Sequence, residues 1–81
     1  MVCAKYNVMI TAMTESCMTP KEIAEKAGVS ANAVYRVRKG YMVKMEILGK
    51  ICKALNLKCE DVLDYERMKQ YNRSQAEKNG Q

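Results

Sequence analysis

The chain has 81 residues and a formal net charge of +5, and it contains no histidine. A chain of this length supports one small hydrophobic core and no second domain. The lack of histidine excludes Ser-His-Asp and Cys-His catalytic arrangements, and no apolar run approaches the roughly 20 residues of a membrane span. The composition therefore predicts a small domain that is neither an enzyme nor embedded in a membrane.

Four cysteines are spread along the chain without any close pair. Structural zinc sites use closely spaced cysteine or histidine pairs, so we expect no metal and no other cofactor. The N-terminus also lacks the continuous apolar stretch of a signal peptide. We therefore expect a cytoplasmic protein with reduced thiols, and a redox role is the alternative. The cysteines are Cys3, Cys17, Cys52 and Cys59.

Residues 4–15 form the first predicted helix. Four apolar residues recur there at helical spacing. Tyr6 and Ile10 favour extended backbone, so a short extended start is the alternative. The apolar residues are Val8, Met9, Ala12 and Met13.

A second helix is predicted to begin after Thr19. The sequence TPKE allows a capping box, in which the Thr19 side chain accepts a bond from the backbone of Glu22 and the Glu22 side chain reaches back. Pro20 occupies the one helical position at which its missing N–H costs nothing. Gly28 follows the helix, where glycine adopts the left-handed backbone without strain. This stretch therefore predicts a short helix and a sharp turn.

A third helix is predicted over residues 31–39. Ser30 offers an N-cap, and Gly40 ends the helix. At about 100° per residue, the side chains divide into an apolar face and a face of amide and cationic groups. The apolar face holds Val34 and Val37, and the polar face holds Asn32, Arg36 and Lys39.

The helix pair over residues 19–40 resembles the helix-turn-helix of the Cro and lambda-repressor-like (XRE-type) DNA-binding proteins. The resemblance continues through LGKICKALNLKCEDVL at residues 48–63 and covers roughly residues 9–65. It implies an all-α fold, a compact bundle of five helices in which the second helix of the pair lies in the DNA major groove. The matching small, turn and apolar positions are Ala24, Gly28, Val34 and Val37.

Two further helices complete the expected bundle. An apolar stripe recurs over residues 44–56, and Asn56 can end that helix in the left-handed conformation. A short last helix follows over residues 60–63. We expect the DNA-binding domain to span residues 1–65, and residues 66–81 to be a polar tail that is either a frayed helix or disordered. The stripe consists of Met45, Leu48, Ile51, Cys52 and Leu55.

The excess positive charge lies on the proposed binding unit. Residues 20–53 hold eight Lys and Arg against three Glu, whereas the charges in the rest of the chain balance. A basic patch confined to one unit is typical of phosphate binding. We therefore expect double-stranded DNA as the partner, and no small-molecule ligand is evident.

The resemblance also implies which side chains touch DNA. Asn bonds adenine bidentately, Arg bonds guanine through O6 and N7, and Ala offers apolar contact to a thymine methyl. For Arg36 the alternative is an ordinary exposed arginine, and for Tyr35 it is packing on its own helix. The expected base contacts are Ala31, Asn32, Tyr35 and Arg36, and the expected phosphate contacts are Thr19, Lys21, Ser30, Lys39 and Lys44.

Two features depart from the family pattern. Family members often form an ion pair at the positions where this chain has Met13 and Arg38. Arg38 is therefore free either to face phosphate or to remain solvated. The connector after Gly40 is also about one residue shorter than is common, which counts against the phosphate contact expected of Lys44.

Taken together, these features predict a sequence-specific DNA-binding transcriptional regulator, and we expect a repressor. A helix-turn-helix module that binds protein, such as an antitoxin-like partner, is the alternative. We expect a homodimer on a pseudo-palindromic site, since one recognition helix reads only a few base pairs. The dimer interface is expected after Leu55, at Leu57, Val62, Leu63 and Tyr65.

Overall fold

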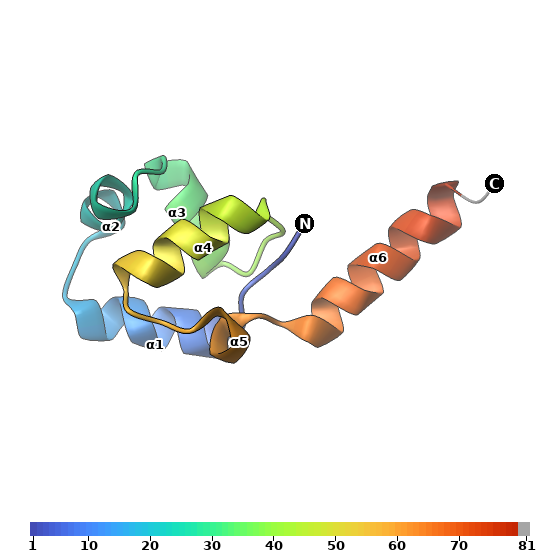
Figure 1. Ribbon diagram of the computed structural model, residues 1–81, viewed down its shortest axis with the longest axis horizontal. Coiled ribbons are helices and arrows are strands. Elements are labelled where there is room, and N and C mark those ends of the chain that lie inside the picture. Colours follow the sequence, from blue (N-terminus) through green and yellow to red (C-terminus); the bar gives the residue numbers. More distant parts are fainter. Residues whose placement is uncertain (80–81) are drawn as a thin grey trace.

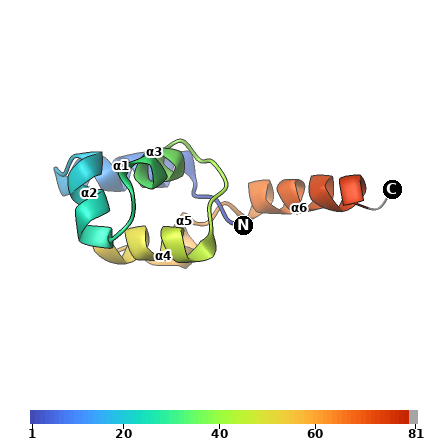
Figure 2. The ribbon, with the colours of Figure 1, turned by 90° about the horizontal axis from the view of Figure 1, so that it is seen from above.

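The computed structural model describes the backbone of residues 1–79 and the side chains of residues 1–73. The first five helices of this part gather around one core, and the sixth projects away from them (Figure 1, Figure 2). The all-α prediction is confirmed, with one helix more than the five expected. The division into a domain over residues 1–65 and a polar tail stays a prediction, and residues 80–81 of that tail lie outside the described residues. The helices are α1 (Tyr6–Ser16), α2 (Pro20–Ala27), α3 (Ala31–Arg38), α4 (Met45–Ala54), α5 (Cys59–Val62) and α6 (Tyr65–Asn79).

The core lies between helices α1 to α5. Helix α2 packs on both α3 and α4, and α1 packs on α3 and α5. Burying an aliphatic side chain of this kind contributes about 1.5–3 kcal/mol. The predicted pairing of α2 and α3 is therefore fixed by burial on both helices. The largest fully buried side chains of the core include Met9, Ile23, Val34, Val37, Leu48, Ile51 and Val62.

The chain begins as an extended segment. Val2 exchanges two backbone hydrogen bonds with Val43, with N···O distances of 2.9 and 2.8 Å, and Ala4 pairs with Leu63. Helix α1 begins only at Tyr6, two residues after the predicted start. The residues before Tyr6 are extended, because they satisfy their backbone groups on two distant segments of the chain. Tyr6 and Ile10, which suggested an extended start, are helical.

Both ends of α2 have the predicted geometry. Thr19 Oγ1 accepts the Glu22 backbone N–H at 3.2 Å, and Glu22 Oε1 accepts the Thr19 backbone N–H at 2.9 Å. The bond from the Thr19 backbone favours the carboxylate and lowers the pKa of Glu22. Gly28, after the helix, has a φ of 76°. The capping box and the left-handed turn are thus confirmed.

Helix α4 ends through a left-handed residue, as predicted. Asn56 has a φ of 57°, and the N–H of Leu57 donates to the carbonyl of Cys52 at 2.8 Å. The helix begins one residue later than expected, because Lys44 has extended backbone and acts as the N-cap. The short helix α5 begins one residue earlier than expected, at Cys59.

Gly28→Ala should lower the free energy of unfolding by about 1–2 kcal/mol, because a left-handed φ strains alanine. Steric contact does not contribute, since a Cβ at Gly28 would meet no atom within 4 Å. Gly49→Ala is the matched control. A Cβ at Gly49 also meets open space, but this residue lies inside α4, where alanine is more stable than glycine by about 0.5–1 kcal/mol. Urea denaturation measures the change in the free energy of unfolding for both variants. Changes of the same sign would contradict the left-handed turn at Gly28.

The thiol of Cys52 should resist alkylation in the folded protein. Burial and the neighbouring Cys59 raise the pKa of Cys52 to about 12, and the thiolate is the reactive form. We expect Cys17 and Cys59, which are exposed, to react first with iodoacetamide, and Cys52 to react only after unfolding. Peptide mass spectrometry follows each thiol, with a denatured sample as the control. Equal rates for Cys52 and Cys17 in native buffer would refute the burial of Cys52.

Candidate nucleic-acid interface

Helix α3 presents one apolar and one polar face, as predicted. The Ser30 hydroxyl accepts a backbone N–H of the first turn at 3.1 Å, which caps the helix. Val34 and Val37 are fully buried, whereas Asn32 and Arg36 are exposed. The buried valines fix the rotation of α3 about its axis, and this rotation leaves the amide and the guanidinium facing solvent.

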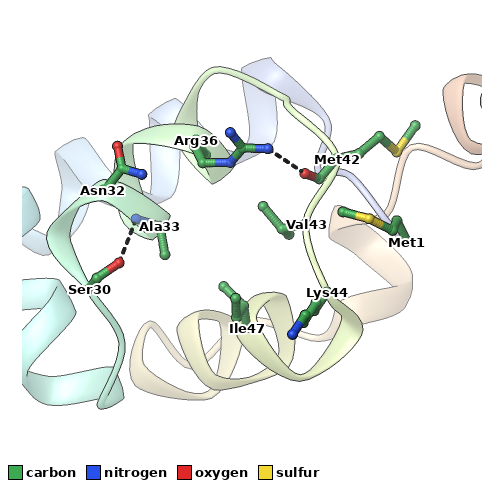
Figure 3. A pocket seen from close by; sticks show the side chains of 9 residues that line it. All are labelled: Met1, Ser30, Asn32, Ala33, Arg36, Met42, Val43, Lys44 and Ile47. Atoms are coloured by element: carbon green, nitrogen blue, oxygen red, sulfur yellow. Dashed lines mark hydrogen bonds between the residues drawn. The ribbon is translucent and has the colours of Figure 1, made fainter.

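A pocket of about 260 Å³ opens between α3 and the start of α4 (Figure 3). Its apolar lining includes Val43 and Ile47. Polar side chains from both helices stand around it, and some of them are expected base contacts while others are expected phosphate contacts. These polar residues are Ser30, Asn32, Arg36 and Lys44.

The chain that follows α3 holds the Arg36 side chain in place. Arg36 Nη2 donates to the carbonyl oxygen of Met42 at 3.2 Å, a bond drawn in Figure 3. The guanidinium carbon also lies over the ring of Tyr41, 5.7 Å from its centroid, which is within cation–π range. Arginine has five N–H donors, so the bond to Met42 leaves donors for a partner.

Tyr35 and Arg38 contact each other on the same helix. The Arg38 guanidinium carbon lies 5.1 Å from the Tyr35 ring centroid, and the tyrosine keeps 42% of its surface exposed. Arg38 also lines a small pocket together with Met13. Arg38 therefore lies between Tyr35 and the end of α1.

The remaining expected DNA contacts lie outside the larger pocket. Thr19 and Lys21 are at the start of α2, and Lys39 is the C-cap of α3. Ala31 begins α3, where it is partly buried against the core. The pocket thus brings together four of the nine expected contacts, and the other five lie outside it on α2 and α3 or at their ends.

The start of α4 has an N-cap without a side-chain bond. Lys44 has the extended backbone of an N-cap residue, but its side chain accepts nothing from the first turn. The N–H groups at a helix start attract anions when no side chain satisfies them. The ammonium group and the helix start therefore favour an anion at the same edge of the pocket.

Sequence reasoning missed the two partners of Arg36. Residues 41–44 read as a connector without strong turn residues, and neither Tyr41 nor Met42 was expected at the site. The signal that could have found them is Gly40, because a glycine that ends a helix commonly folds the next residue back onto the last turn.

The functional groups of this surface are amide, hydroxyl, guanidinium and ammonium groups. Among the residues that the structure describes, no three Cys, Asp or Glu side chains come together as possible metal ligands. Over the same part of the chain, every helix is too short or too polar to cross a bilayer.

A capped pair of short helices, with an exposed amide and guanidinium on the second, defines a helix-turn-helix DNA-binding domain. The family profile of the Cro/C1-type HTH DNA-binding domain matches residues 10–67. Because this match covers more than half of the chain, the protein belongs to the Cro/C1-type helix-turn-helix family. The resemblance found in the sequence is thereby confirmed. A search of the curated proteins finds no match.

Proposed function

We propose that this protein is a sequence-specific DNA-binding transcriptional regulator that acts as a repressor in the cytoplasm. One observation carries the proposal: Asn32 and Arg36 stand exposed on the face of α3 that lies opposite its buried valines. Side chains of this chemistry read base edges in the major groove. Membership of a DNA-binding family supports DNA as the partner over the protein-binding alternative.

In this proposal, α3 enters the major groove with its polar face toward the bases. Asn32 bonds the N6 and N7 edge of adenine, and Arg36 bonds the O6 and N7 edge of guanine. These two residues are about one helical turn apart, so they read neighbouring base pairs. Ala31 offers apolar contact to a thymine methyl, and Tyr35 lies beside them.

Phosphate contacts on both sides of α3 set the register. Thr19 and Lys21 hold one phosphate with the start of α2, while Ser30 and Lys44 hold another beside the pocket. Lys39 reaches a phosphate from the end of α3. These contacts supply affinity and salt dependence, and they carry no sequence preference of their own.

The protein is further proposed to bind as a homodimer to a pseudo-palindrome. A two-fold pair doubles the contact at half-sites about one helical turn apart. Burial narrows the interface that the sequence suggests, because Val62 is fully buried in the core and Leu63 is partly covered where it pairs with Ala4. Tyr65, which is 56% exposed, is the side chain best placed for the interface.

Tyr65→Asp should shift the protein toward monomer, because a buried unpaired charge at an apolar interface is costly. Tyr6→Asp is the matched control, since Tyr6 is 54% exposed and lies outside the proposed interface. Sedimentation equilibrium, with and without a selected duplex, measures the association. A wild-type protein that stays monomeric on its operator would reject the dimer.

Substitutions at the proposed base contacts and at the proposed phosphate contacts should have different effects on DNA binding. Arg36→Ala should cost about 1–3 kcal/mol on the preferred duplex and relax the preference at one base pair, because the bidentate contact to guanine has no equivalent at other bases. Asn32→Ala should act likewise at a separate position. Lys21→Ala should instead weaken binding to all sequences alike, and it should reduce the slope of log affinity against log salt by about 1.

The preferred duplex is first obtained by selection from a random library. Each variant is then measured on matched and mismatched duplexes at several salt concentrations. Equal loss on every duplex for Arg36→Ala would make Arg36 a phosphate contact and overturn the proposed reading face. Failure to enrich any sequence would favour the protein-binding alternative.

A further inference from the structure

We propose that Tyr41 is a positioning residue that sharpens the sequence preference of Arg36 by holding its guanidinium ready for one base pair. This inference rests on the proposed function, because it takes Arg36 to read a base. The inference is based on the contacts that Arg36 makes with Tyr41 and Met42. Tyr41 itself lies in the connector between α3 and α4.

The end of α3 brings Tyr41 back to Arg36. Gly40 has a φ of 83°, so the chain reverses direction there. The N–H of Gly40 donates to the carbonyl of Val37 at 3.1 Å, and the N–H of Tyr41 donates to the carbonyl of Arg36 at 2.9 Å. These two bonds close a Schellman motif, which fixes the backbone of Tyr41 on the last turn of the helix.

The Tyr41 ring and the Met42 backbone carbonyl then both restrain the guanidinium. The Tyr41 ring lies 5.7 Å from Arg36 Cζ, and the Met42 carbonyl accepts from Arg36 Nη2 at 3.2 Å. A free, exposed arginine loses much rotamer freedom when it binds a base. Because these contacts remove part of that freedom beforehand, they raise the affinity for the correct base.

The segment that supplies the ring and the carbonyl is itself anchored at both ends. On one side, Val43 is buried and exchanges two backbone hydrogen bonds with Val2. On the other side, Gly40 is buried, and its N–H donates to the carbonyl of Val37. The ring and the carbonyl therefore have a fixed support.

A second arginine–tyrosine pair on α3 offers a comparison. Arg38 lies 5.1 Å from the Tyr35 ring centroid, but Arg38 lines the pocket on the α1 side, whereas Arg36 lines the pocket beside α4. Only the pair of Arg36 and Tyr41 is joined by the Schellman closure. A change at Tyr35 should therefore act independently of Arg36.

The test is a double-mutant cycle on duplex binding. We measure Tyr41→Leu and Arg36→Ala, singly and together, on the selected duplex and on the same duplex with the guanine pair replaced. Tyr41→Leu should weaken binding to the matched duplex about two- to fivefold, as expected for an exposed cation–π contact, and it should leave the mismatched duplex unaffected. In the Arg36→Ala background, Tyr41→Leu should have no effect.

Three further variants serve as controls. Tyr41→Phe keeps the ring face, so it should retain the preference of the wild type. Tyr6→Leu removes a tyrosine of similar exposure in α1, and it should leave both affinity and preference unchanged. The effect of Tyr35→Leu should be additive with Arg36→Ala. In the free protein, the ring-current shift of the Arg36 side-chain protons should persist in Tyr41→Phe and vanish in Tyr41→Leu.

Each other outcome is decisive. If Tyr41→Leu weakens every duplex equally, also in the Arg36→Ala background, Tyr41 contacts phosphate itself and the inference is overturned. If Arg36→Ala abolishes discrimination while Tyr41→Leu leaves it intact, the inference fails and the proposed function stands. If Arg36→Ala leaves discrimination intact, the proposed reading face fails and the inference falls with it.

Discussion

The proposed DNA-binding surface depends on the burial of Val34 and Val37. Both side chains are fully buried, and each contributes about 1.5–3 kcal/mol that would be lost if α3 turned about its axis. A rotation by one residue, about 100°, would expose them and bury polar groups in their place. The exposed positions of Asn32 and Arg36 therefore follow from the packing of the core. The valines that stabilise the domain therefore also orient its exposed polar side chains.

Two glycines determine how α3 is joined to its neighbours. Gly28 and Gly40 have φ values of 76° and 83°, a region that strains residues with a Cβ. At the first of them the chain turns sharply between α2 and α3, and the small Ala24, which is only 4% exposed, allows the two helices to pack closely. At the second the chain reverses and returns to the last turn of α3. One glycine thus sets the angle between α2 and α3, and the other brings Tyr41 and Met42 to the polar face of α3.

The features that could be predicted from the sequence are those with local causes. Three such features are the capping box at Thr19, the cap at Ser30 and the left-handed Asn56. Each depends on residues within a few positions, so it can be predicted from the local sequence. The pairing of Val2 with Val43 joins residues far apart in sequence, and no local pattern specifies it. The contact between Arg36 and Tyr41 falls between these cases, because it needs the backbone reversal at a glycine before the two side chains can meet.

The connector between α3 and α4 contributes both to the hydrophobic core and to the proposed binding site. Val43 is buried and pairs with the start of the chain, while the residues on either side of it contribute to the site through the Met42 carbonyl and the Lys44 ammonium. Because the connector is short, the start of α4 stays close to α3, and Lys44 lines the same pocket as Arg36. Lys44 therefore lies on the surface where a phosphate contact is proposed. A substitution at Val43 would disturb this surface even though the side chain never faces solvent, since both neighbours are held by its burial.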